Sequence, residues 1–171
     1  MSLSAPYDQN EESGSILLTL DPRRFGSFPA GVIWRGARLA KKGEFHVTLL
    51  HARSISKLRE LANQDIARFF DSFVEKFSLG LISFIDDFRY AEEAEKRTIL
   101  VRCVVSELDA LFREFGKKFG IALPTQPAHV TLYTLQKNAG IHINSDTTMQ
   151  GLERVDLPEL EVAFATILKA T

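Results

Sequence analysis

The stretch Phe45-His46-Val47-Thr48-Leu49-Leu50 is answered later in the chain by Ala128-His129-Val130-Thr131-Leu132-Tyr133. The chain has four histidines, and two of them are followed by the same tripeptide, Val-Thr-Leu. From average residue frequencies, such an agreement arises by chance on the order of once in a thousand. We therefore interpret the two stretches as copies of one motif, and the rest of the sequence is considered around them.

Both copies are expected to form β-strands, because they are rich in β-branched residues and alternate in polarity. The predicted strands cover residues 44–51 and 128–134. In each strand the histidine and the threonine two residues later project from the same face, roughly 7 Å apart, while the intervening valine points to a core. Two such strands side by side would present two imidazoles and two hydroxyls to one cleft.

The segments between and beyond the motifs predict a mixture of helices and strands. Residues 55–77 and 107–119 carry apolar side chains at helical spacing and are expected to be helices, the second ending at Gly120. Charged residues 89–97 predict an exposed turn, and residues 21–31 and 137–149 predict loops. The other expected strands are residues 15–20, 32–34, 81–88, 98–105 and 160–168.

From residue 44 onward, the expected order is strand, helix, strand, strand, helix, strand. This is the βαββαβ arrangement of split-βαβ folds, and it predicts an α+β fold of two βαβ-type halves with a pseudo-twofold relation. Residues 1–14 are polar and acidic and predict a disordered leader, whereas residues 15–171 are expected to form one domain.

Composition limits the classes of function. The 171 residues are 45% hydrophobic and 25% charged, and the formal net charge of −1 argues against a broad nucleic-acid footprint, although not against recognition of one phosphate. The single cysteine excludes an internal disulfide framework. Because no apolar run approaches the roughly 20 residues that span a bilayer, we expect a soluble, cytoplasmic protein with no membrane contact.

The two motifs carry the predicted chemistry. Imidazole titrates near neutral pH, so His46 and His129 can share the roles of general base and general acid. The hydroxyls of Thr48 and Thr131 can donate hydrogen bonds to phosphate oxygens. No Asp, Glu or Cys lies near the two histidines at ligand spacing, so we expect neither a metal nor another cofactor.

Three further residues near the motifs allow two interpretations each. Tyr133 is expected on the face of His129, where it either binds phosphate or a base, or packs as an ordinary strand aromatic. If its strand continues, His51 lies on the face opposite His46, which favours a structural or surface role. His142 lies in the loop after the second motif and either borders the cleft or, as we favour, lies on the surface.

Paired His-x-Thr-x motifs on two related strands resemble the 2H phosphoesterase superfamily, which includes the bacterial 2′-5′ RNA ligase and cyclic phosphodiesterase proteins. Pro127-x-His129-Val-Thr-Leu is similar to that family's second motif. The order of helices and strands resembles that of the family over most of the chain, from residue 15 onward. The residues themselves match only in the two motifs. It implies a two-lobed α+β fold with both histidines in a central cleft lined by antiparallel or mixed sheets.

The same resemblance implies metal-independent phosphodiester chemistry on a 2′,3′-cyclic phosphate, a 2′-5′ linkage or an RNA end. The substrate would be a nucleotide cyclic phosphate or an RNA terminus, His46 and His129 would be catalytic, and Thr48 and Thr131 would hold the phosphate. No protein partner is implied, and we expect a monomer.

The alternative is a module of the same fold that binds RNA ends or nucleotides without turnover. The βαββαβ order is also that of the RNA-recognition fold, which reads bases with aromatic residues on its central strands. Residues 98–105 contain no aromatic side chain, which speaks against that fold.

Overall fold

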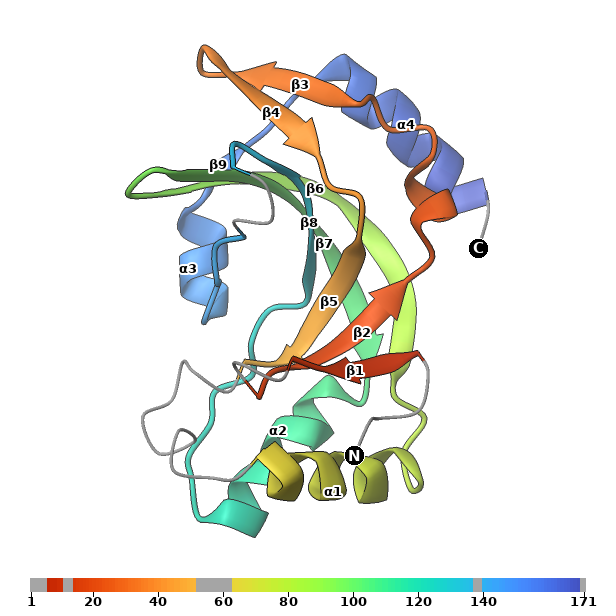
Figure 1. Cartoon of the computed structure of the whole chain (residues 1–171), viewed down its shortest axis with the longest axis vertical. Coiled ribbons are helices and arrows are strands. Elements are labelled where there is room, and N and C mark those ends of the chain that lie inside the picture. The colour runs from red at the N-terminus through yellow and green to blue at the C-terminus, as the bar shows by residue number, and fades with distance from the viewer. Residues whose placement is uncertain (1–5, 11–13, 52–62, 137–139, 170–171) are drawn as a thin grey trace.

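The computed structural model describes residues 6–10, 14–51, 63–136 and 140–169, and within them the chain is α+β, with one large antiparallel sheet and four α-helices (Figure 1). The elements in chain order are β1 (Tyr7–Gln9), β2 (Ile16–Leu20), the 3₁₀ helix η1 (Pro22–Phe25), β3 (Gly31–Trp34), β4 (Ala37–Lys41), β5 (Phe45–Leu50), α1 (Asn63–Val74), β6 (Gly80–Glu93), β7 (Lys96–Ser106), α2 (Leu108–Phe119), β8 (His129–Thr134), α3 (Asp146–Gly151), β9 (Glu153–Arg154) and α4 (Pro158–Lys169).

The sheet has the strand order β1-β2-β5-β8-β7-β6-β9, and the β3–β4 hairpin joins it through β4 and β8. The order strand, helix, strand, strand, helix, strand from β5 to β8 is confirmed. The βαβ-type halves are not, because β7 and β8, which flank α2, are antiparallel neighbours, whereas a βαβ unit joins parallel strands. The two motif strands, β5 and β8, are direct neighbours in the middle of the sheet.

The two faces of the sheet are covered differently. One face packs against α1, α2 and α4 and forms the main core, with α1 and α2 together at one end of the molecule and α4 at the other (Figure 1). On the opposite face, residues from β6, β7, the 141–143 segment and α3 form a smaller cluster, made of Ala91, Leu100, Ile141, Ile143 and Met149. That second face carries the motif histidines.

Residues 160–168, predicted as a strand, are instead part of helix α4. The buried residues Leu160, Ala163, Phe164 and Ile167 recur at spacings of three and four, which is the period of a helix face. Pro158 at the first helical position and two glutamates in the first turn favour a helix start there. The strand prediction is therefore wrong, because the buried residues follow a helical period.

Residues 89–97 are not an exposed turn. β6 and β7 extend through them as a long hairpin, in which Glu93 pairs with Lys96 and only residues 94–95 turn. Ala94 adopts a left-handed backbone conformation at that tip, with φ of 52°. The charged side chains are accommodated because they pair across the strands, as in the 2.9 Å ion pair between Arg97 and Glu92.

The predicted disordered leader contains a strand. Residues Tyr7–Gln9 form β1 and pair with β2. Tyr7 anchors it, because its ring lies edge-on to Phe70 at 5.1 Å and its hydroxyl donates a hydrogen bond to the carbonyl of Leu79. Residues 1–5 and 11–13 lie outside the described residues.

The remaining helix and loop predictions are partly confirmed. The helix expected at 55–77 is confirmed over α1, which ends at Val74, whereas residues 75–77 are not helical and residues 55–62 lie outside the described residues. The loop expected at 137–149 gives way to α3, whose N-cap Ser145 accepts a hydrogen bond from the Thr148 amide. The loop expected at 21–31 contains η1. Besides β1, the strands missed among the described residues are β4 and β9.

The stop of α2 at Gly120 is confirmed and allows a test of the fold. Gly120 has φ of 66°, and a side chain there would be strained although no atom lies within 4 Å of an added Cβ. Replacing Gly120 by alanine should lower the free energy of unfolding by about 1 kcal/mol, measured by chemical denaturation. Gly43→Ala is the matched control, since that site is open and not left-handed, and its stability should be unchanged or slightly raised.

Candidate active site

The two motifs meet through one pair of residues. Val47 of β5 lies opposite Val130 of β8 in antiparallel register. Continuing that register by one residue in each direction places His46 opposite Thr131, and Thr48 opposite His129. Opposite residues of an antiparallel pair share a face and lie about 5 Å apart, and diagonal neighbours lie about 7–8 Å apart. These four half-buried side chains, His46, Thr48, His129 and Thr131, are called the quartet below.

Each motif strand contains a β-bulge at the same position of its copy. On β5, Ile16 and Leu17 of β2 pair with Leu50 and Thr48, so Leu49 is the extra residue. On β8, consecutive residues of β7 pair with Tyr133 and Thr131, so Leu132 is the extra residue. Both bulges come three residues after the motif histidine. The repeat is therefore present in backbone geometry as well as in sequence.

The bulges explain why the predicted strand faces of His51 and Tyr133 are wrong. A bulge adds one residue and reverses the alternation that follows it. Leu49 and Leu50 are therefore both buried on the core side, and His51 returns to the face of the quartet. In the second copy Leu132 and Tyr133 are both buried, so Tyr133 leaves the face of His129.

Tyr133 is fully buried and its hydroxyl donates a 3.1 Å hydrogen bond to the carbonyl of Pro29. Burial is the main cause that raises the pKa of this phenol above its usual value. The structure thus brings together the quartet as predicted, and it places Tyr133 in the core.

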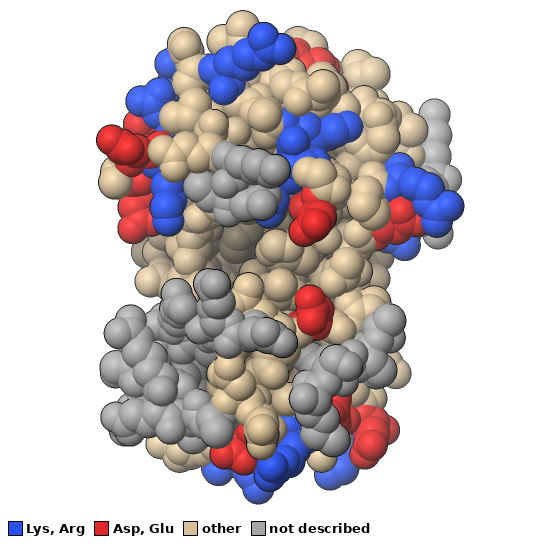
Figure 2. Space-filling view, in the orientation of Figure 1, with Lys and Arg blue, Asp and Glu red and all other residues tan. Residues whose placement is uncertain are grey.

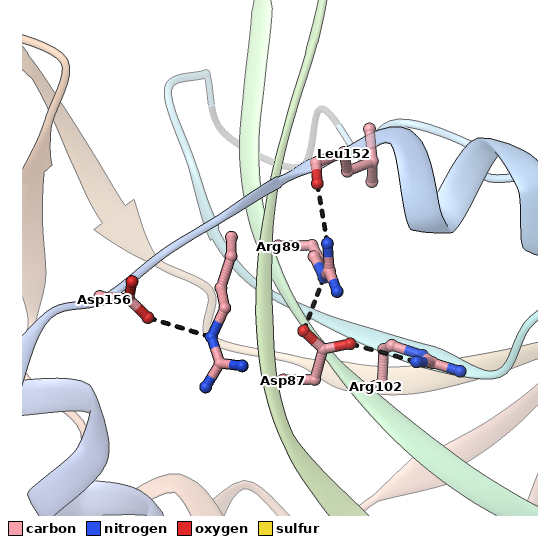
Figure 3. A network of polar contacts seen from close by, with 6 residues as sticks. Asp87, Arg89, Arg102, Leu152 and Asp156 are labelled. Atoms are coloured by element: carbon pink, nitrogen blue, oxygen red, sulfur yellow. Dashed lines mark hydrogen bonds and ion pairs between the residues drawn. The ribbon is translucent and has the colours of Figure 1, made fainter.

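An ion-pair network borders the quartet on the side of β7. Arg102 lies directly opposite His129. Its guanidinium contacts Asp87 at 3.1 Å, and Arg89 contacts the other oxygen of the same carboxylate at 2.6 Å (Figure 3). Burial alone would raise the pKa of Asp87, but the hydrogen bonds from both arginines outweigh it and the pKa lies below its ordinary value. Two cations share one anion, so these three side chains together carry one positive charge.

The segment around His142 borders the other side of the quartet. A Cβ added to Gly140 would lie 3.8 Å from Thr131 Oγ1, so the backbone there passes close to the quartet. The rings of His142 and His51 stack, with centroids 3.8 Å apart. His142 also interacts electrostatically with His129. All four histidines of the chain therefore gather in one region, which sequence reasoning did not predict because the bulge in β5 and the fold of residues 140–143 carry no local signal.

A backbone carbonyl fixes the ring of His129. Its Nδ1 lies 2.8 Å from the carbonyl oxygen of Pro127. Because a carbonyl oxygen only accepts, Nδ1 must carry the hydrogen, which leaves Nε2 to exchange a proton with a ligand. The proline two residues before the histidine thus orients the imidazole as well as directing the chain into β8.

The imidazoles of the site are held in their neutral form. Burial lowers the pKa of His46 to about 4, with smaller contributions from the positive charge of Lys42 and from His129. Burial also lowers the pKa of His129, although the hydrogen bond to Pro127 acts in the opposite direction. At neutral pH, both imidazoles of the ligand-free protein are therefore uncharged in a positively charged environment, an arrangement that favours an anionic ligand.

The surface around the site is mixed in charge. Figure 2 shows acidic and basic side chains interspersed, and a hollow at the waist of the molecule at the level where β5 and β8 run in Figure 1. Among the described residues, no group of three or more His, Cys, Asp and Glu side chains is placed to hold a metal ion. Within the same residues, no helix is long and apolar enough to cross a membrane.

Comparison of the chain with known protein families, with curated proteins and with solved structures finds no match.

The burial of Tyr133 leads to a prediction that separates folding from ligand binding. Tyr133→Phe removes the hydroxyl that bonds to Pro29 and should lower the free energy of unfolding by about 1 kcal/mol. Phosphate binding, measured by calorimetry, should be unchanged because the hydroxyl faces the core. Weaker phosphate binding with unchanged stability would restore Tyr133 to the site.

The low imidazole pKa values predict how stability depends on pH. In the unfolded chain His46 and His142 protonate near the ordinary value of 6.5, whereas in the folded protein they do so near 4. Between these values the unfolded state binds more protons, so the free energy of unfolding should fall as the pH is lowered from about 6.5 to 4. NMR titration of the imidazole C–H signals measures the same shift, and midpoints near 6.5 would contradict it.

Proposed function

We propose that the protein is a metal-independent phosphodiesterase that acts on a 2′,3′-cyclic phosphate, or on a 2′-5′ linked nucleotide or RNA end, by acid–base catalysis with two histidines. One observation carries the proposal: Val47 pairs with Val130, which sets two imidazoles and two hydroxyls on one face around a local twofold axis. Such an arrangement suits a phosphoryl group approached from both sides.

In the proposed reaction, a water molecule attacks the phosphorus of the cyclic phosphate. One imidazole removes a proton from the water as the new P–O bond forms. The other donates a proton to the ribose oxygen as the old P–O bond breaks. The hydroxyls of Thr48 and Thr131 donate hydrogen bonds to the non-bridging oxygens and stabilise the negative charge that develops there. Solvent then returns each imidazole to its starting protonation state.

The low pKa values of the free protein fit this scheme once the substrate is bound. Both imidazoles are neutral at pH 7 without a ligand, so either is available as the base. A bound phosphate diester is negatively charged and raises the pKa of the imidazoles beside it, which lets one of them carry the proton that the leaving group needs. The site thus acquires one neutral and one protonated imidazole through substrate binding.

We further propose that the fold is the two-lobed α+β architecture of the 2H phosphoesterases, with the quartet in the central cleft between the lobes. The matched bulges and the placement of α1 and α2 at one end and α4 at the other support this proposal. We expect the protein to act as a cytoplasmic monomer, and the single cysteine, Cys103, is buried as that setting allows.

The test is turnover of nucleoside 2′,3′-cyclic phosphates in the presence of EDTA. His46→Ala and His129→Ala should each lower kcat by roughly a hundred- to ten-thousandfold, the usual worth of a general acid or base. Because the two histidines act as a unit, the double variant should be little worse than either single one. Full activity in either single variant, or loss of wild-type activity on chelation, would contradict the mechanism.

The hydroxyls are tested by Thr48→Val and Thr131→Val, which keep the side-chain shape and should lower kcat roughly ten- to a thousandfold. Thr166→Val on α4 is the matched control, because its exposed hydroxyl bonds only to its own helix. A wild-type protein that binds cyclic phosphates but does not turn them over would instead indicate the non-catalytic binding module.

A further inference from the structure

The mechanism uses two of the four histidines, and a third lies close enough to take part. His142 stacks on His51 with an angle of 21° between the rings. Its Nε2 is buried and has no hydrogen-bond partner among the described residues. Buried polar atoms in folded proteins nearly always have a partner, so an unpaired one at the edge of a site indicates a place for a ligand or water.

The segment that carries His142 is firmly attached beside the quartet. Ile141 and Ile143 are buried in the cluster on the site face of the sheet, together with Leu100. Leu100 lies opposite Thr131 in the register of β7 and β8. The burial of the segment alternates, so His142 projects away from the cluster that its two neighbours enter. Its position is therefore set by apolar packing on both sides.

Two observations direct His142 toward the phosphate position. A Cβ added to Gly140, two residues earlier, would lie 3.8 Å from Thr131 Oγ1, so the backbone that leads to His142 runs beside the quartet. His142 also interacts electrostatically with both His51 and His129, which requires its ring to lie near theirs. The stacked His51 ring restricts the plane of the imidazole, so that its nitrogen is held in position before a ligand arrives.

We propose that His142 is a substrate-binding residue whose Nε2 forms a hydrogen bond with an oxygen of the ribose phosphate held by the quartet. This inference rests on the proposed function of the site and adds a residue to it. A phosphate oxygen accepts, and a ribose hydroxyl both donates and accepts, so a neutral imidazole can serve either one in the appropriate tautomer. His51 contacts His142 through the ring stack, a contact that His51→Phe keeps.

A pair of matched variants separates hydrogen bonding from packing. His142→Phe and His51→Phe each keep an aromatic ring for the stack and each remove two ring nitrogens. If His142 serves only as packing, the two variants should behave alike. If Nε2 binds the substrate, His142→Phe should weaken binding of a nucleoside 2′-phosphate roughly ten- to a hundredfold, the range for a lost hydrogen bond to a charged group. His51→Phe should change it by less than about threefold.

The measurements are calorimetric binding of a nucleoside 2′-phosphate and of inorganic phosphate, kcat and KM for the cyclic phosphate, and thermal unfolding as a check on folding. A loss with both ligands assigns the contact to a phosphate oxygen, and a loss with the nucleotide alone assigns it to the ribose. His142→Asn should recover part of the binding, because its amide can supply a hydrogen bond. Unchanged binding in a folded His142→Phe protein overturns the inference.

The two proposals fail in different ways. In one outcome, wild-type turnover depends on His46 and His129, but His142→Phe has normal binding and a normal KM. The proposed function then stands, and only the role of His142 is contradicted. Absence of turnover in the wild type removes the proposed function, and the nucleotide-binding comparison still decides whether His142 contacts a ligand. Equal losses in both phenylalanine variants would show that binding does not depend on Nε2 of His142 in particular, which overturns the inference.

Discussion

The pairing of Val47 with Val130 is the constraint on which the site depends. Because this pair is antiparallel, each histidine faces the threonine of the other copy rather than its own. A shift of one residue in either strand would turn the valine of that strand to the site and its histidine and threonine into the core. Val47 and Val130 are fully buried, so either shift would expose a buried valine and bury two polar side chains. The free-energy cost of that exchange fixes the register of the two strands and therefore the position of the quartet.

The environment of the site converts this geometry into a preference for anions. Desolvation keeps the imidazoles neutral, while Lys42 and the paired arginines around Asp87 supply positive charge close by. Interactions between charges strengthen where water is excluded, so an entering phosphate gains more here than on an open surface. The same desolvation makes the site costly to protonate in the absence of a ligand, which links its chemistry to the stability of the fold.

The sequence predicted the quartet well and its surroundings poorly, for a physical reason. Alternation along a strand requires only local information, and it placed His46, Thr48, His129 and Thr131 on one face. A bulge depends on how a strand pairs with its neighbour, and Leu49 does not differ in type from an ordinary strand residue. Every inference that crossed a bulge therefore failed. His51 was expected on the face opposite His46, and Tyr133 was expected on the face of His129.

The same limit applies to the larger elements. Helical period is strong enough to predict α2 and its end at Gly120, whereas residues 160–168 form a helix although their apolar composition is also compatible with a strand. The charged hairpin of β6 and β7 was missed because its stability comes from pairing between strands. Local sequence pattern thus predicted the α+β class and the order of elements from β5 to β8. The direction and register of the strands depend on contacts between distant segments and could be determined only from the folded structure.

The twofold relation between the motifs ends at their immediate neighbours, and this difference fits the different roles that the proposed mechanism gives the two histidines. On the β5 side, His46 pairs with the exposed Thr19 of β2 and lies near Lys42. On the β8 side, His129 pairs with Arg102 and is fixed by the carbonyl of Pro127. A duplicated motif supplies two equivalent imidazoles, but in the proposed mechanism the acid and the base must differ in protonation state when the reaction begins. The unequal flanking strands favour such a difference, so the repeat sets the positions of the two proposed catalytic groups and their surroundings distinguish them.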